Sequence, residues 1–175
     1  MNRPGSVIQG FFSQGIAQVA ARFRVSSAVQ PVRSISPIQR HTAGSGSAFP
    51  LPDHLAGFTQ VGGQPLPAAV RQKMESFFGA SFADVRVHVG PHASSIGALA
   101  FTQGTHIHFA PGQYNPSSPQ GQQILGHELT HVVQQRAGRV RNPFGSGVAV
   151  VQDVALEAEA ERLGRRAAAS VARVP

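Results

Sequence analysis

The sequence contains no cysteine and no tryptophan, and only one of its 175 residues is a tyrosine. The absence of cysteine excludes a disulfide framework and any thiolate metal site, so a metal would need histidine, aspartate or glutamate ligands. No stretch approaches the roughly 20 apolar residues of a membrane-spanning helix, so we expect no membrane span. Residues 1–23 lack a convincing signal peptide, because Gln9, Ser13 and Gln14 interrupt the apolar run.

Acidic residues are also scarce, with eight against 15 basic residues, which gives a formal net charge of +7. Such an excess of arginine can indicate an acidic partner such as nucleic acid. Here the arginines are scattered, their longest run is Arg165–Arg166, and no basic patch has interleaved aromatic residues. We therefore do not expect nucleic acid as a partner.

The distribution of charge and small residues predicts two parts. Residues 1–62 are expected to be a basic, low-complexity leader and linker, because the first acidic residue is Asp53 and residues 29–52 are rich in serine, proline and glycine. Within this leader, residues 7–24 have the spacing of a short amphipathic helix, and the remainder is expected to be largely disordered. Residues 63–175 are expected to form the folded domain.

The domain alternates helical and strand patterns, which is typical of an α+β fold. Helices are expected over 67–79, 91–100, 117–138 and 150–174, and strands over 82–90 and 100–112. Pro67 and Pro119 suit first helical turns, and Gly79 and Gly138 suit helix ends. We expect a short, mostly antiparallel sheet packed on the helix that ends near Gly138.

Residues 126–135 read GHELTHVVQQ and place two histidines four residues apart around a glutamate. On a helix, His127 and His131 lie on one face, so both imidazoles can bind one Zn²⁺. Glu128 is rotated by about 100° from His127 and can instead take a proton from a metal-bound water. The pattern therefore predicts a zinc site in which Glu128 is the general base.

A catalytic zinc with three protein ligands needs one more side chain. The metzincin pattern would require glycine at position 134 and histidine at position 137, where this chain has Gln134 and Ala137. The following helix offers three glutamates instead, and Asp153 is a weaker alternative. Glu157 and Glu161 lie four residues apart on one face, so Glu157 can be the ligand while Glu161 accepts the second N–H of a zinc-binding histidine.

From Pro67 to Gly138 the sequence resembles the bacterial domain family DUF4157, metallopeptidase-like domains found with extracellular contractile injection systems, which are phage-tail-like toxin-delivery particles. The matching stretches are LPAAVRQKMESFFGASFADVRVHVGPHAS, ALAFTQGTHIHFAPGQYNPSSPQGQQILGHELTHVVQQRAG and, more loosely, LEAEAERLG. The resemblance implies a zincin-like fold, a peptide or protein substrate, and partners among the components of such a particle.

The domain also resembles the thermolysin-type zinc peptidases in a reduced form. That resemblance matches Glu157 to the third zinc ligand, whereas Glu161 stands where an aspartate is usual. It also matches AFTQG, residues 100–104, to a strand at the edge of the cleft. The backbone near Leu99 and Ala100 is then expected to pair with an extended substrate, which adds a strand to an exposed edge.

Together these features predict zinc-dependent hydrolysis of peptide bonds. The zinc would polarise the scissile carbonyl, and Glu128 would pass a proton from water to the leaving amine. The donor for the oxyanion stays open, with Tyr114, His106 and His108 as candidates. The target is either a protein in the attacked cell, which would make the chain an effector, or the chain's own linker over residues 34–49.

The alternative is a catalytically inactive module. In that interpretation the metal only stabilises the fold, and the chain serves as a cargo or packaging domain with the leader as a loading signal. For both functions we expect the protein to be made in the bacterial cytoplasm, loaded into an injection particle and delivered outside.

Overall fold

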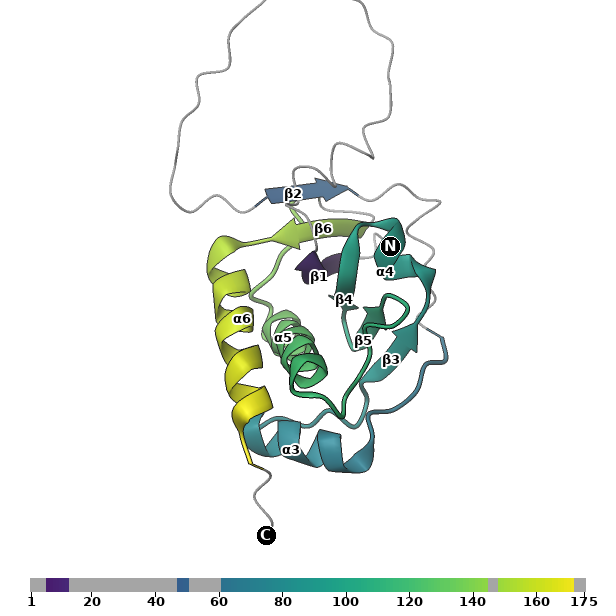
Figure 1. Ribbon diagram of the computed structural model, residues 1–175. Coiled ribbons are helices and arrows are strands. Elements are labelled where there is room, and N and C mark those ends of the chain that lie inside the picture. Colours follow the sequence, from purple (N-terminus) through teal and green to yellow (C-terminus); the bar gives the residue numbers. More distant parts are fainter. Residues whose placement is uncertain (1–5, 13–46, 51–60, 145–147, 172–175) are drawn as a thin grey trace, which may run out of the picture.

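The computed structural model describes residues 6–12, 47–50, 61–144 and 148–171. They form one six-stranded sheet with helices packed against it (Figure 1). The strands are β1 (Ser6–Phe12), β2 (Ser47–Pro50), β3 (Arg86–Val89), β4 (Ala98–Gln103), β5 (His106–Phe109) and β6 (Val148–Gln152). The helices are α3 (Ala68–Phe78), α4 (Pro91–Ser95), α5 (Pro119–Arg136) and α6 (Val154–Ala169). The α+β fold class is confirmed.

The strands follow the order β2-β6-β1-β4-β5-β3 across the sheet. Pairing is antiparallel between β1 and β4, β4 and β5, and β2 and β6. It is parallel between β1 and β6 and between β3 and β5, so the sheet is mixed. β1 therefore lies in the interior of the sheet, between two strands that come much later in the chain.

The two helices with the clearest end signals begin and end where the sequence predicts. At the start of α5, the Ser118 hydroxyl accepts a hydrogen bond from the Gly121 N–H at 3.0 Å, and Pro119 occupies the first turn. Beyond its end, Gly138 has a φ of 65°, a left-handed conformation that favours glycine. α3 likewise begins directly after Pro67 and ends directly before Gly79.

Several sequence predictions are wrong in the described residues. Residues 7–12 of the helix expected over 7–24 form most of strand β1, while residues 13–24 lie outside the described residues. Residues 148–152 form β6, so α6 begins later than expected. The helix expected over 91–100 ends at Ser95, and the strand expected over 100–112 is a hairpin of β4 and β5.

The expected leader contributes two strands to this sheet, β1 and β2. β1 joins it because it pairs with β4 and β6, both within the part expected to fold. The division of the chain at residue 62 stays a prediction, and most of residues 1–62 lie outside the described residues.

α5 lies between the sheet and α6 (Figure 1). Its apolar side packs into one core with α3 and the strands β3, β4 and β5. The buried members of this core are Leu66, Met74, Phe82, Val85, Val87, Ala100, Ile107, Phe109, Leu125, Leu129, Val132 and Ala167. Among the described helices, none has both the length and the apolar character needed to cross a membrane.

Two glycines allow α5 and α6 to approach closely. A Cβ added to Gly164 of α6 would lie 2.7 Å from the carbonyl oxygen of Gln123 and 2.9 Å from the backbone nitrogen of His127. A Cβ on Gly126 of α5 would lie 3.1 Å from the Cα of Gly164. These neighbours are backbone atoms and cannot rotate away. The absence of side chains at the two glycines therefore allows α6 to lie directly beside the GHELTH segment.

Candidate metal centre

Three side chains from α5 and α6 converge on one point. His127 and His131, one turn apart on α5, are 3% and 0% exposed, and their Nε2 atoms are 3.0 Å apart. Glu157, in the first turn of α6, places Oε2 3.4 Å from Nε2 of His127 and Oε1 3.5 Å from Nε2 of His131. Within the described residues, these three form the group that could hold a metal ion.

The separations of these donor atoms fit a small divalent cation. Ligands at 2.0–2.1 Å from a tetrahedral Zn²⁺ lie about 3.3 Å from one another, and the three observed separations bracket that value. Within the described structure, buried Oε1 of Glu157 also has no hydrogen-bond partner. A buried carboxylate oxygen is costly without one, and a cation between the three groups would satisfy it.

Gln134 fixes the orientation of one imidazole. Its Nε2 donates to the carbonyl oxygen of Leu156 at 3.1 Å and to Oε2 of Glu159 at 2.9 Å, so its Oε1 must face His131. That oxygen lies 2.8 Å from Nδ1 of His131 and can only accept a hydrogen bond. Nδ1 of His131 therefore carries the proton, which leaves Nε2 of the neutral ring with its lone pair aimed at His127 and Glu157.

The charges around the triad favour a cation or a proton at this point. Burial opposes protonation of His131, but the adjacent carboxylates of Glu157 and Glu128 outweigh burial and raise its pKa. Burial also opposes ionisation of Glu157, yet the two imidazoles outweigh it and lower the pKa of that carboxyl. A divalent cation and a proton would compete for the space between His127, His131 and Glu157. Metal binding should therefore weaken as pH falls.

We expect Gln134→Ala to weaken metal binding by about 10- to 100-fold, the usual cost of losing the partner that orients a ligating histidine. The His131 ring would no longer be held in the tautomer that presents Nε2. Titration with Zn²⁺ against a competing chelator measures the change. Gln120→Ala, an exposed position on the same helix, is the matched control. Equal affinity in both variants would contradict the role given to Gln134.

Glu128 lies beside the triad but is wholly buried. Its Oε2 accepts a hydrogen bond from the Thr102 hydroxyl at 2.8 Å, and its Oε1 accepts one from the backbone N–H of Phe11 at 3.1 Å. Burial raises the pKa of Glu128, and it is opposed by the two imidazoles and the Thr102 hydrogen bond. A carboxyl with a raised pKa is suited to general-base work near neutral pH.

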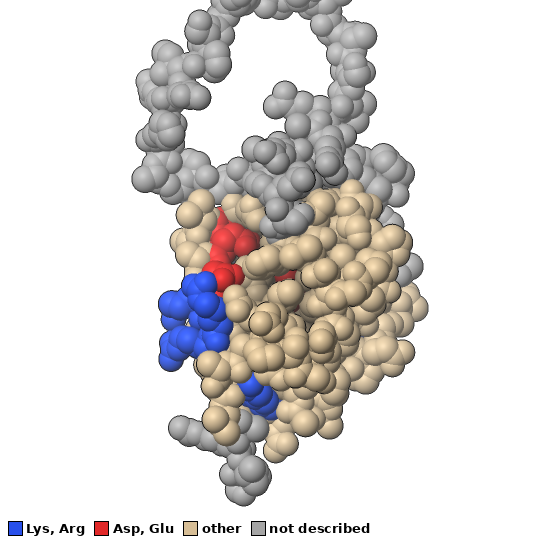
Figure 2. All heavy atoms as spheres, viewed as in Figure 1, with Lys and Arg blue, Asp and Glu red and all other residues tan. Residues whose placement is uncertain are grey.

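The other glutamates of α6 are held by arginines. Oε2 of Glu161 is 3.7 Å from Nδ1 of His127, longer than a hydrogen bond, while its Oε1 contacts Arg165. Glu159 pairs with Arg139 at 2.7 Å. Acidic side chains near the start of α6 and basic side chains lie next to one another on this face (Figure 2). Because arginines compensate Glu159 and Glu161, Glu157 is the carboxylate left to face the histidines.

The predicted oxyanion donors are not brought to the triad. Tyr114 packs against Phe109, with ring centroids 5.0 Å apart, at the margin of the core. Ile107 and Phe109 of β5 face the core, so His106 and His108 point to the opposite side of the sheet from α5. There Nε2 of His88 lies 2.9 Å from Nδ1 of His106.

The edge predicted at Leu99 and Ala100 is not open. Ala100 pairs with Phe11 of β1 on one side and with Phe109 on the other, and the Leu99 carbonyl accepts a hydrogen bond from the Ala110 N–H at 2.8 Å. The expectation of an exposed β4 edge is therefore wrong, because β1 covers that edge.

His108 gives the fold an acid-sensitive group. Its ring stacks between Phe101 and His88, and burial together with His88, His92 and His106 lowers the pKa of His108 to about 3. Because the folded pKa lies below the unfolded value of about 6.5, the stability that the neutral ring provides is lost as pH falls from about 6.5 towards 3. At pH 4.5 this loss amounts to about 2–3 kcal/mol.

We expect His108→Phe, which keeps a stacked ring but cannot titrate, to remove most of this loss. Urea unfolding at pH 7.5 and pH 4.5, with a chelator present so that metal loss makes no contribution, measures it. An unchanged pH dependence in the variant would show that other groups cause the acid sensitivity.

Sequence reasoning missed Gln134, Thr102 and Phe11. Gln134 could have been found, because it lies three residues after His131 and is a polar side chain at a position where the helix faces inward. Thr102 lies within AFTQG, on the strand face that alternation directs to the helix. Nothing local indicated Phe11, whose hydrogen bond to Glu128 spans 117 residues.

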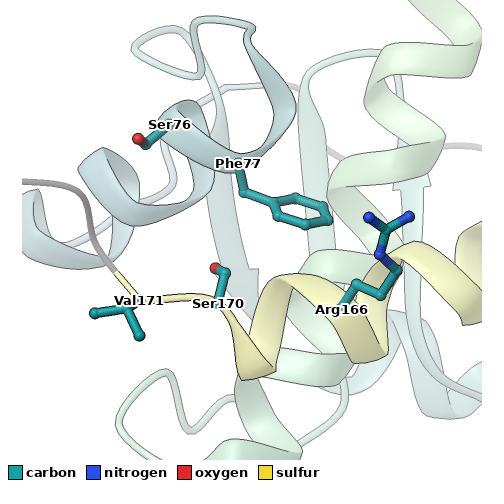
Figure 3. A pocket seen from close by; sticks show the side chains of 5 residues that line it. All are labelled: Ser76, Phe77, Arg166, Ser170 and Val171. Carbon is teal, nitrogen blue, oxygen red and sulfur yellow. The ribbon is translucent and has the colours of Figure 1, made fainter.

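A hollow opens directly in front of the triad. Its lining residues are Gly10, Phe11, His127, Gln152, Glu157, Ala158 and Glu161. A separate, larger hollow between α3 and the end of α6 contains none of the triad residues (Figure 3). Its lining residues are Ser76, Phe77, Arg166, Ser170 and Val171. The smaller hollow is therefore the one that opens onto the triad.

Comparison with protein families finds a match in part of the chain. Residues 65–139 match the family model described as the eCIS core domain, eCIS_core, which covers α3 through α5 and confirms the resemblance to DUF4157. No curated protein matches the chain, and no solved structure does. The match associates the chain with contractile injection systems, and its description names no catalytic activity.

Proposed function

Because residues 65–139 carry an eCIS core domain, we propose that this chain is a zinc-dependent endopeptidase associated with a bacterial contractile injection system. The observation that supports it most strongly is the convergence of His127, His131 and Glu157 at tetrahedral separations beside Glu128. In this proposal the protein is made in the bacterial cytoplasm and loaded into the particle.

The donor set favours zinc among the divalent metals. Two imidazoles and one carboxylate are a common ligand set of catalytic zinc, with the fourth position left for water or substrate. Calcium and magnesium prefer six or more oxygen ligands, whereas two of the three donors here are nitrogens. His127, His131 and Glu157 would hold the ion, and Glu161 is the candidate partner for the second nitrogen of His127.

When bound, zinc would polarise a substrate carbonyl and acidify the attacking water. Glu128 would accept the proton from that water and return it to the amine of the leaving group. Thr102 holds one oxygen of Glu128, so the other oxygen is the one available for proton transfer. In the present arrangement that second oxygen accepts a hydrogen bond from the Phe11 N–H.

A second candidate function is supported by the burial of Glu128. A silent site is expected to enclose its carboxylate, and Glu128 is wholly buried with a hydrogen bond on each of its oxygens. The chain would then be a metal-stabilised cargo or packaging module of the particle. Zinc content alone does not separate the two functions, because both retain the ion.

Glu128→Gln separates them. We expect the variant to keep one zinc per chain, because Glu128 is not a ligand, and to lose peptide cleavage by about 10²- to 10⁴-fold, the usual contribution of a positioned base. Zinc is measured by elemental analysis and cleavage with a broad peptide library.

The intact masses of the wild type and Glu128→Gln test self-processing in the linker: equal masses exclude it. A zinc-loaded wild type that cleaves nothing, even after the displacement of β1 described below, favours the module.

A further inference from the structure

We propose that substrate binds in the position that β1 occupies beside β4. The substrate is an extended peptide in which glycine is followed by an aromatic residue. In the present structure Ser6–Phe12 of the chain itself occupies this site as a ligand. This inference rests on the proposed peptidase function and specifies its substrate class. It also implies that the enzyme is latent while β1 stays in place.

The backbone of β1 binds as an added peptide strand would. It pairs antiparallel with β4, with Gln9 opposite Thr102, Gly10 opposite Phe101 and Phe11 opposite Ala100. On its other side it pairs with β6 only through Ser6–Ile8. Addition of a strand to a sheet edge is a general way to bind extended peptides. The Gly10–Phe11 portion, which has no partner from β6 in this register, is the part that lines the hollow of the metal centre.

Phe11 contacts both the general base and a metal ligand. Its backbone N–H donates to Oε1 of Glu128 at 3.1 Å, and its ring meets the His127 ring edge-on with centroids 5.3 Å apart. An amide N–H at this distance from Glu128 lies where the leaving amine of a substrate would have to receive its proton. The resident strand therefore uses the hydrogen-bonding capacity that Glu128 would need for an attacking water.

Gly10 shows which residue a bound peptide must have at this position. A Cβ at this position would lie 2.4 Å from the carbonyl oxygen of Ala100 and 2.4 Å from the Cα of Phe101. Both are backbone atoms of a strand paired on its far side, so neither can move aside cheaply. A peptide that replaces β1 in this register must therefore have glycine at the position of Gly10.

Side-chain contacts show what release of β1 would change. Gln9 is wholly buried, and its Oε1 accepts a hydrogen bond from Nε2 of Gln135 at 3.2 Å. Loss of β1 would remove this hydrogen bond together with the one from Phe11 to Oε1 of Glu128, and it would leave the β4 edge unpaired. An incoming peptide of the same class would restore the backbone contacts that the resident strand had made.

The test uses the full chain with a specific protease site inserted between residues 30 and 31, so that the protein folds before it is cut. After the cut, a fluorescent peptide of sequence SVIQGFF is added in excess and its anisotropy is followed. We expect the cut protein to take up this peptide and the uncut protein to take up at least tenfold less. The matched control is the same peptide carrying Gly10→Val, which should bind at least tenfold more weakly.

Equal uptake of both peptides, or a cut protein that keeps its own fragment and takes up neither, would show that β1 is a permanent strand and would overturn the inference. Uptake is measured without reference to hydrolysis, so the two proposals fail separately. Glycine-dependent uptake without any cleavage of the peptide library would support the binding site and contradict the peptidase.

Discussion

Zinc content should fall from one ion per chain to a small fraction of that in Glu157→Ala. The variant leaves two imidazoles 3.0 Å apart without the carboxylate that bridges them. Since losing a group that merely orients a ligand costs about 10- to 100-fold in affinity, losing a ligand should cost more. Elemental analysis after dialysis and titration against a chelator measure the loss, and the zinc-dependent rise in melting temperature should disappear with it.

Asp84→Ala is the matched control for Glu157→Ala. It also removes one carboxylate, but from an exposed ion pair with Arg136, far along the chain from the histidines. Its zinc content should equal that of the wild type. Stoichiometric, tightly held zinc in Glu157→Ala would show that the third ligand comes from elsewhere, and the assignment of α6 to the site would fail.

Gly164→Val should be the most damaging substitution on α6. Even its Cβ would lie 2.7 Å from the Gln123 carbonyl oxygen and 2.9 Å from the His127 nitrogen. The helices must separate, and overpacking of this kind costs typically 1–3 kcal/mol and sometimes more. We expect a loss of about 3 kcal/mol in the free energy of unfolding, measured by urea denaturation. Zinc affinity should fall as well, because Glu157 moves with α6.

Ala155→Val serves as the control, because it adds the same branched side chain at an exposed position of α6. It should cost well under 1 kcal/mol, the size of a helix-propensity difference. If Gly164→Val were as stable as this control and bound zinc equally well, the close approach of the two helices would not be what positions Glu157.

The candidate metal ligands could be predicted from sequence because the information that specifies them is local. His127 and His131 share a helix face by periodicity alone, and the helix that carries them has a serine cap and a terminal glycine. Glu157 followed from the need for a third ligand and from the shortage of acidic residues. Its distance from the histidines did not follow, because it depends on Gly126 and Gly164, whose contacts lie between helices.

The strand β1 could not be predicted because its partners are remote. Residues 7–24 contain apolar side chains at spacings that suit an amphipathic helix, and residues 7–12 form a strand only because β4 and β6 are present on either side. The same strand explains why the expected open edge at Ala100 is closed. Where tertiary pairing decides between helix and strand, local pattern is a weak guide.

The interior position of β1 also has a consequence for biosynthesis. This strand is synthesised before both of its neighbours in the sheet, because β4 begins at Ala98 and β6 begins at Val148. Pairings between segments so distant in the chain form slowly. During translation, therefore, Ser6–Phe12 has to wait without its native partners, and Glu157 follows only after β6. The candidate metal centre cannot assemble until α6 has been synthesised, long after β1.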